Sequence, residues 1–290
     1  MNSRRTFIKQ AGLAAAGAAL LPYYACSPAS AKSVGIQLYS LRELLPKDVK
    51  GVIQKVAQTG YKEVETYGYT AETGFWGLDA KAFKALLDDN GLKAPSGHFG
   101  LDEYIKTGDQ EILKPLIAGA AALNMEYFTC PYLSEELRTS LEDYKKVAAR
   151  LNEAAKLCKE SGLQMAYHNH DFEFVKYGDT TGYDILLAET DKNLVHFELD
   201  LYWVVRSGND PIAMFEKTPG RFVMWHVKDM DKTDNTINTE VGNGKIDFKS
   251  IHKHAAQAGL KHLIVEQENF SIDPFESIKK SFDYVNRELV

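Results

Sequence analysis

The sequence predicts an α/β protein built as a single-domain (β/α)8 TIM barrel. Short apolar runs typical of buried strands alternate eight times with amphipathic helical patterns from residue 34 onward. Parallel strands need a long crossover, usually a helix, so this alternation indicates a parallel sheet. The chain has 290 residues, and α/β barrels commonly take about 250 residues as one domain. No low-complexity segment or domain linker interrupts the pattern after residue 32.

The expected strands are short runs rich in aliphatic and aromatic residues, which suit strands that are buried on both faces. In chain order they are residues 34–39, 61–66, 92–98, 125–130, 163–168, 194–200, 222–228 and 262–268. Helical periodicity predicts the connecting helices at residues 47–59, 79–90, 110–123, 141–161, 184–190, 211–216, 248–258 and 274–288.

Glycines and long connections support the same arrangement. Gly60, Gly91, Gly162 and Gly259 each follow a helical run and precede a strand. A left-handed residue is wanted there to end the helix. Two longer connections, at residues 67–78 and 228–245, follow strands. We therefore expect them on the face of the barrel that carries catalysis.

Residues 1–32 are expected to be an export signal, which leaves residues 33–290 as the barrel. Arg4 and Arg5 precede an apolar, Ala-rich run and resemble a twin-arginine signal. Signal peptidase would cut after Ala31, whereas lipidation of Cys26 would make the protein a membrane-anchored lipoprotein. Both alternatives predict an exported, periplasmic protein. The remaining alternative is a cytosolic extension without structure.

Charge and composition favour a small-molecule partner. The chain is 44% hydrophobic and 26% charged, and its net charge is −6. A nucleic-acid-binding protein normally presents a basic face, so the acidic balance argues against a nucleic-acid partner.

Polar residues gather where the expected strands end. The carboxyl ends of barrel strands converge, so residues far apart in sequence can form one site. Those ends carry Tyr39, Glu65, His98, His168, His170, Glu173, Asp200, His226, Lys228, Glu266 and Glu268. Carboxylates and imidazoles dominate this set. They suit a divalent metal, with Mn²⁺ preferred and Co²⁺, Mg²⁺ or Zn²⁺ as alternatives.

Five segments resemble one known group of enzymes. They are residues 35–42 (GIQLYSLR), 167–174 (YHNHDFEF), 198–203 (ELDLYW), 225–229 (WHVKD) and 264–268 (IVEQE). These segments resemble the xylose isomerase-like superfamily of sugar isomerases, epimerases, dehydratases and lyases. The resemblance runs from about residue 34 to the C-terminus, and its most specific parts are YHNHDFEF and HVKD.

The resemblance implies a metal held by residues from four strands. A carboxylate comes from near the end of the fifth strand, an Asp from the sixth, a His from the seventh and a Glu from the eighth. On this chain the last three are Asp200, His226 and Glu266. His168 or Glu173 completes the set, and Glu173 is favoured because more carboxylates better neutralise a hard dication.

The other residues are assigned to catalysis and substrate binding. His170 and Lys228 are expected to move protons, and His98 is expected to assist them or bind a substrate hydroxyl. The expected substrate-binding residues are His168, Tyr39, Glu65, Trp203 and Glu268. Structural alternatives are core packing for Trp203, a core hydrogen bond for His98 and a salt bridge for Asp200.

The resemblance and the export signal together lead to a functional hypothesis. The protein would remove a proton next to a carbonyl of an unphosphorylated sugar or a 3-keto-glycoside, and so act as a lyase or an isomerase. A companion sugar oxidoreductase would supply the ketone. One alternative is a ketose 3-epimerase or sugar isomerase acting on free sugars. Another is an inactive, metal-bearing periplasmic sugar-binding protein.

Overall fold

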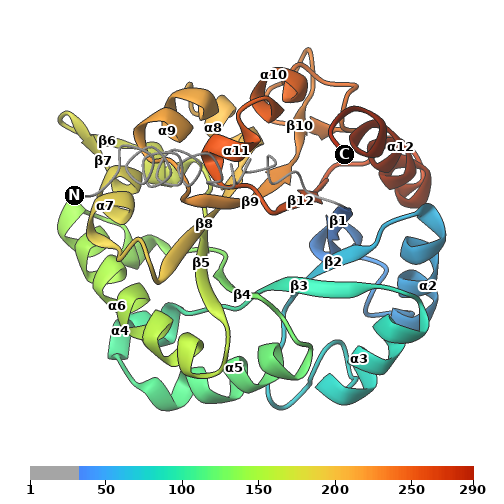
Figure 1. The fold of residues 1–290 in the computed structure, drawn as a ribbon, viewed down its shortest axis with the longest axis horizontal. Coiled ribbons are helices and arrows are strands. Elements are labelled where there is room, and N and C mark those ends of the chain that lie inside the picture. Colours follow the sequence, from blue (N-terminus) through green and yellow to red (C-terminus); the bar gives the residue numbers. More distant parts are fainter. Residues whose placement is uncertain (1–32) are drawn as a thin grey trace, which may run out of the picture.

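The computed structural model describes residues 33–290 and confirms the predicted fold class. Eight parallel strands close into a barrel, and helices form a ring around them (Figure 1). Around the barrel the strands are β1 (Val34–Gln37), β12 (His262–Val265), β9 (Phe222–Val227), β8 (Val195–Asp200), β5 (Gln164–His168), β4 (Tyr127–Cys130), β3 (Lys93–His98) and β2 (Glu63–Tyr67). The expected export signal and lipid anchor at Cys26 lie outside the described residues.

The helices follow the strands in the expected alternation. They are α2 (Val49–Thr59), α3 (Ala80–Asp89), α4 (Asp102–Thr107), α5 (Leu113–Ala122), α6 (Leu141–Glu160), α7 (Gly182–Glu189), α8 (Leu201–Arg206), α9 (Pro211–Lys217), α10 (Phe248–His252), α11 (Ala255–Ala258) and α12 (Pro274–Glu288). None of the helices within residues 33–290 has the length and apolarity to cross a bilayer.

Several strands end earlier than the sequence predicts. The backbone N–H of Tyr39 donates to the Gln37 side chain at 3.0 Å, and the chain turns into a short 3-10 helix, Leu38–Leu41. Strands β9 and β12 likewise end at Val227 and Val265. The polar residues that follow these strands therefore lie on loops at the mouth of the barrel.

Two short helices, α4 and α8, were not predicted. The α8 helix begins because the Asp200 side chain caps it, accepting the backbone N–H groups of Tyr202 and Trp203 at 2.9 and 3.2 Å. The last strand residue of β8 is thus also the N-cap of the helix that follows. The helix cap therefore holds Oδ1 of Asp200, whereas Oδ2 takes no part in the cap.

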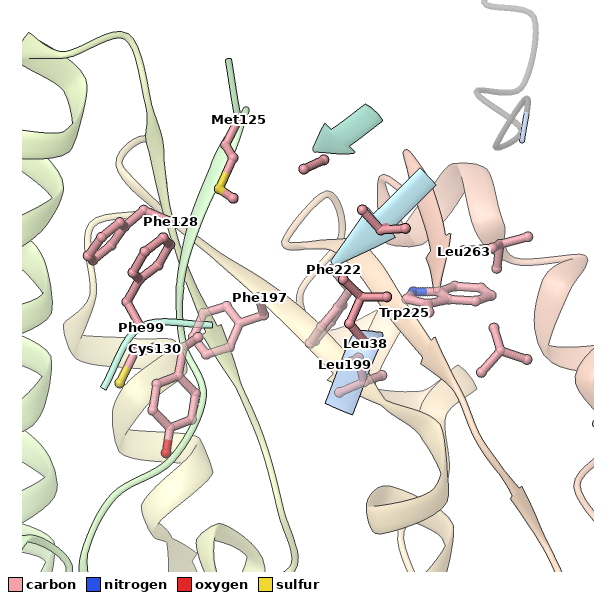
Figure 2. Packing of buried hydrophobic residues seen from close by; sticks show 14 of the residues in the cluster. Leu38, Phe99, Met125, Phe128, Cys130, Phe197, Leu199, Phe222, Trp225 and Leu263 are labelled. Carbon is pink, nitrogen blue, oxygen red and sulfur yellow. The ribbon is translucent and has the colours of Figure 1, made fainter. Parts of the chain in front are cut away.

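Alternation along the strands separates the core from the site. Side chains on a strand point to opposite faces in turn. On β9, Trp225 stacks on Phe215 of α9, with ring centroids 4.9 Å apart, so it belongs to the layer between sheet and helices. Figure 2 shows Trp225 in this apolar layer, and Phe99 packed against Phe128 in another part of it. The neighbouring His226 therefore points into the barrel.

A buried aspartate orders the long connection after β9. Asp229 accepts the backbone N–H groups of Met230, Gly242, Gly244 and Ile246 at distances from 2.8 to 3.1 Å. Two short strands, β10 (Asp229–Met230) and β11 (Asn238–Thr239), pair within this connection. The predicted long loop is therefore an ordered structure rather than a random coil.

Candidate active site

Four side chains converge at the mouth of the barrel. His168 ends β5, Asp200 ends β8, His226 lies near the end of β9 and Glu266 follows β12. Each offers one ligand atom, and these atoms all lie within 4.8 Å of one another. All four residues are buried, with at most 5% of their surface exposed. The four residues therefore have the composition and spacing of a metal site, and we call them the metal-type group.

The hydrogen bonding within this group fits a bound cation. His168 Nε2 and Asp200 Oδ2 are buried, and neither has a hydrogen-bond partner within residues 33–290. A buried polar atom without a partner is costly. The two atoms lie 3.6 Å apart, so one cation could contact both. Two imidazoles and two carboxylates suit Mn²⁺, Co²⁺ or Zn²⁺.

Neighbouring oxygens orient both imidazole rings. His168 Nδ1 lies 3.1 Å from the carbonyl oxygen of Pro131. His226 Nε2 lies 2.7 Å from Glu65 Oε2, and its Nδ1 faces Glu266 at 3.1 Å. A metal-binding histidine commonly donates its other N–H in this way, which fixes the tautomer. His168 would then offer Nε2 to a cation, and His226 would offer Nδ1.

Below this group lies a second cluster, formed by Glu65, His98, Glu198 and His226. His98 Nε2 lies 2.8 Å from Glu198 and 3.2 Å from Glu65. Burial lowers the pKa of His98, but these two carboxylates outweigh burial and raise it to about 9. Burial likewise raises the pKa of Glu65, yet His98 and His226 hold it well below its usual range. The cluster therefore combines ionised Glu65 with a protonated His98.

The sequence reasoning missed Glu198. It precedes Asp200 by two residues on β8, and residues two apart on a strand share a face. That spacing was the available signal. Gln37 was missed in the same way: its side chain donates to Glu65 at 2.7 Å.

Lys228 is buried among carboxylates. Its Nζ lies 3.2 Å from Glu266 and 3.9 Å from Asp200, and it also pairs with Glu268. Burial lowers the pKa of Lys228, but Glu266, Asp200 and Glu268 outweigh it and raise the pKa well above its usual range. The amine therefore keeps its proton and acts as a hydrogen-bond donor.

The structure does not bring Glu173 to the metal-type group. Its carboxylate accepts the Tyr167 hydroxyl at 2.7 Å and the His170 backbone N–H at 2.9 Å. Burial raises the pKa of Glu173 to about 8, although those two donors act to lower it. The residues after β5 form a 3-10 turn, Phe172–Phe174, that folds the carboxylate back into the protein. His168 occupies the place for which the sequence favoured Glu173.

His170 stands beside the group without joining it. Its ring centroid lies 5.0 Å from that of His168 and 5.4 Å from that of Trp203. Its Nδ1 has no partner within the described residues. Burial, followed by the charge of His168, lowers the pKa of His170 well below its usual range. His170 is therefore a neutral imidazole.

A cavity of about 460 Å³ opens above these residues. It is lined by Tyr39, Tyr67, Gly68, His98, Gly100, Pro131, Tyr132, His168, His170, Trp203, Glu266 and Glu268. Seven residues of the predicted site are among them. The other five, Glu65, Glu173, Asp200, His226 and Lys228, are buried and are not among the lining residues.

A second cavity of about 400 Å³ lies at the opposite end of the barrel. Its walls include Glu63, Lys93 and His262, the first residues of β2, β3 and β12. Barrel enzymes place chemistry at the carboxyl ends of their strands. We therefore assign the candidate active site to the cavity above His168.

Comparison with known proteins shows the family to which the fold belongs. The profile of the xylose isomerase-like TIM barrel family matches residues 53–288. Inosose dehydratase from Clostridium beijerinckii is 28% identical over 166 residues, which are 51% of this chain and 55% of that protein. Inosose dehydratase from Clostridium tetani is 28% identical over 177 residues, or 54% and 59% of the two chains. The chain thus spans about half the length of the curated relatives it matches.

Solved structures show the same architecture over nearly the whole chain. A sugar phosphate isomerase/epimerase from Parabacteroides distasonis has 27% identity and a TM-score of 0.76, covering 90% of this chain and 95% of that one. A D-allulose 3-epimerase from Methylomonas sp. has 16% identity and a TM-score of 0.69, covering 90% and 99%; this second likeness concerns the fold alone. Because the family profile covers most of the sequence, the chain belongs to the xylose isomerase-like TIM barrel family.

Proposed function

We propose that the protein is a divalent-metal-dependent enzyme that removes a proton next to the carbonyl of a sugar or 3-keto-glycoside, and thereby acts as a lyase or an isomerase. One observation carries the proposal. Four buried ligand residues, two of them with unpartnered ligand atoms, meet below a cavity whose wall holds the neutral His170. Relatives named inosose dehydratase and sugar phosphate isomerase/epimerase support this class of reaction.

The metal site in this proposal consists of His168, Asp200, His226 and Glu266, with Mn²⁺ as the preferred ion. A cation bound there supplies a Lewis acid that polarises the substrate carbonyl and stabilises the charge that develops on its oxygen. Lys228 donates hydrogen bonds to Glu266 and Glu268. It thereby holds a metal ligand and a cavity-lining carboxylate in place.

His170 is the proposed base, on the strength of its position. It lines the cavity, and its Nδ1, which is buried, has no protein partner in the described part of the chain. Glu173 accepts its backbone N–H and so fixes the turn that presents the ring. The Nε2 atom of His98 contacts Glu198 and Glu65. Its Nδ1 atom is therefore the one that would bind a substrate hydroxyl in the cavity. A positioned acid or base of this kind typically contributes about 10²–10⁴-fold in rate.

The proposed elimination changes no overall oxidation state, so it needs no oxidant or reductant. The proton on the carbon beside the ketone passes to His170, and its electron pair forms a carbon–carbon double bond. The bond from the adjacent carbon to the leaving oxygen breaks, and that oxygen takes a proton and departs as an alcohol. In isomerisation or epimerisation the proton instead returns to the sugar. A companion sugar oxidoreductase would form the ketone of a 3-keto-glycoside beforehand.

The alternative enzyme is a ketose 3-epimerase or sugar isomerase acting on free sugars. The Parabacteroides distasonis relative, 27% identical over nearly its full length, is named a sugar phosphate isomerase/epimerase; this name supports isomerisation or epimerisation, but of a phosphorylated sugar. The cavity supports an unphosphorylated substrate in either case, because no lysine or arginine is among its lining residues. Phosphate groups are normally bound by such side chains.

Product analysis tests the proposal. The full chain is stripped with a chelator, reloaded with Mn²⁺, and given 3-keto-glucosides and a panel of free ketoses. We expect aglycone release or epimer formation only in the reloaded protein, and a loss of about 100-fold or more in His170→Gln. A metal-loaded protein that converts none of these sugars would contradict the proposal. If it binds them without conversion, it is a sugar-binding protein instead.

We also propose that residues 1–32 direct export through a twin-arginine route. Mass spectrometry of the mature protein from the periplasmic fraction should show an N-terminus after Ala31, or a lipid on Cys26. Replacing Arg4 and Arg5 by lysine should retain the precursor in the cytoplasm. Full-length cytoplasmic protein with an intact Met1 would contradict export.

A further inference from the structure

The active-site cavity has two chemically different halves. The inner half is lined by His98, His168, His170 and Glu266. Of these, His168 and Glu266 belong to the metal-type group. Tyrosines dominate the outer half, and two of them are among the few large apolar side chains exposed in the described chain: Tyr39 at 39% and Tyr132 at 44%. Proteins enclose drug-sized ligands in cavities of roughly 300–1,000 Å³, so about 460 Å³ leaves space beyond a single sugar ring.

One wall of the outer half comes from the loops after β1 and β2. Tyr39 meets Tyr67 edge to face, with centroids 5.1 Å apart, and Tyr67 meets Trp76 in the same way at 5.1 Å. The guanidinium of Arg42 lies 4.7 Å from the centroid of the Tyr39 ring and also donates to the carbonyl oxygen of Glu268. These contacts hold the wall in place before any ligand binds.

The facing wall comes from the loops after β4 and β5. Tyr132 meets Phe172 and His170 edge to face, with both centroid distances 5.3 Å. The Arg138 guanidinium lies 3.7 Å from the centroid of Phe172. Both arginines thus support aromatic rings, and neither is among the lining residues. The outer half is aromatic and without a lysine or arginine of its own.

Rigid aromatic walls favour a flat ring, and the lack of cationic lining disfavours an anion. We propose that the outer half of the cavity is a subsite for a neutral aromatic aglycone, so that the substrates are aryl glycosides oxidised to ketones. This inference rests on the proposed function for the inner half. It adds the class of group that leaves the sugar.

Binding of unreactive glycosides tests the subsite separately from catalysis. The metal-loaded full chain is titrated calorimetrically with both anomers of phenyl and methyl glucoside, and with cellobiose. None of these sugars carries a ketone, so turnover does not interfere. We expect at least one phenyl anomer to bind about tenfold or more tightly than its methyl counterpart, since a phenyl ring can make aromatic contacts with the tyrosines that a methyl group cannot make.

Variants assign the effect to the two walls. Tyr132→Ala and Tyr39→Ala should each bring the ratio of phenyl to methyl glucoside affinity close to one, whatever change each variant makes to methyl glucoside binding itself. Phe275→Ala, a half-buried aromatic on α12 outside the cavity lining, should preserve the advantage. Equal affinity for phenyl and methyl glucoside would overturn the subsite even if the enzyme processes sugar ketones. Tighter binding of cellobiose than of either phenyl anomer would overturn it in favour of a second sugar.

Discussion

At the scale of single residues, His168 and Glu173 show how a turn decides between two candidate ligands. His168 ends β5 and Glu173 lies in the turn that follows, and ligand chemistry alone favoured the carboxylate. The structure turns Glu173 toward Tyr167 and the His170 backbone and leaves His168 facing Asp200. Sequence patterns do not encode which way a short 3-10 turn folds, so this choice could not be made in advance.

Removing His168 should therefore impair metal binding, whereas removing the charge of Glu173 should not. In calorimetric titrations with Mn²⁺, His168→Ala should weaken binding by more than the roughly 10–100-fold typical of losing an outer partner. Glu173→Gln, in the turn that follows β5, is the matched variant. If Glu173→Gln loses the metal and His168→Ala retains it, the ligand assignment is reversed.

Glu173 should also make stability depend on pH. Its pKa is raised by burial to about 8, so the folded protein favours the protonated form. The stabilisation is present below the unfolded pKa and is lost as pH rises to about 8, by roughly 1.4 kcal/mol per pH unit at most.

Urea unfolding of the chelated protein from pH 5 to 9 measures this effect. Glu173→Gln mimics the protonated acid, so wild type should lose stability relative to this variant as pH rises. A difference between the two proteins that stays constant over this range would rule out the assigned cause.

The carboxylates beneath the metal-type group should act through His226 and His98. Glu65→Gln weakens the acceptor for His226 Nε2, and Glu198→Gln weakens that for His98. We expect Glu65→Gln to lower Mn²⁺ affinity roughly 10–100-fold, as for other partners that orient a ligand. Ser96→Ala is the control, because this buried side chain bonds only Thr129. Unchanged affinity in Glu65→Gln would show that His226 needs no such partner.

At the scale of elements, hydrophobic periodicity predicted the eight strands and most helices but not their ends. Strand β1 stops at Gln37 because that side chain accepts the Tyr39 N–H, and β8 ends in a helix because Asp200 caps α8. Both are local side-chain bonds that apolar patterning does not report. Glycine predicted a helix end more accurately, because Gly259 ends α11 with φ +84°. A Cβ added at this position would also lie 2.9 Å from the Gly220 backbone.

The connection after β9 should depend on Asp229. Asp229→Ala leaves four backbone N–H groups without their acceptor. An unsatisfied buried group costs about 1–3 kcal/mol, so we expect a loss of about 3 kcal/mol or more in urea unfolding.

Asp231→Asn provides a control in the same connection. The Asp231 side chain is half-buried, and its hydrogen bonds to Thr233 and Asp234 lie at the surface of the connection. Surface changes usually stay within about 0.5 kcal/mol. Equal losses in Asp229→Ala and Asp231→Asn would contradict the anchoring role of Asp229.

At the scale of the whole molecule, the sequence predicted a closed parallel barrel because eight β–α units alternate without a linker. Barrel closure brings β1 beside β12, so the first and last strands of the described chain lie side by side. Closure also explains why residues as distant as Glu65 and His226 could be assigned to one site. Glu198 and the aromatic wall at Tyr132 were not predicted, because strand register and loop shape determine which side chains face the cavity.

The proposed activity requires a cation on His168, Asp200, His226 and Glu266 for proton removal beside a sugar carbonyl. Its most direct test is deuterium incorporation from heavy water into a 3-keto-glucoside and into free ketoses, followed by NMR as Mn²⁺ is titrated into the chelated full chain. We predict incorporation at the carbon next to the carbonyl that rises with Mn²⁺ and saturates near one ion per chain. Exchange at the same rate in the chelated protein, or none with the metal bound, would contradict the claim.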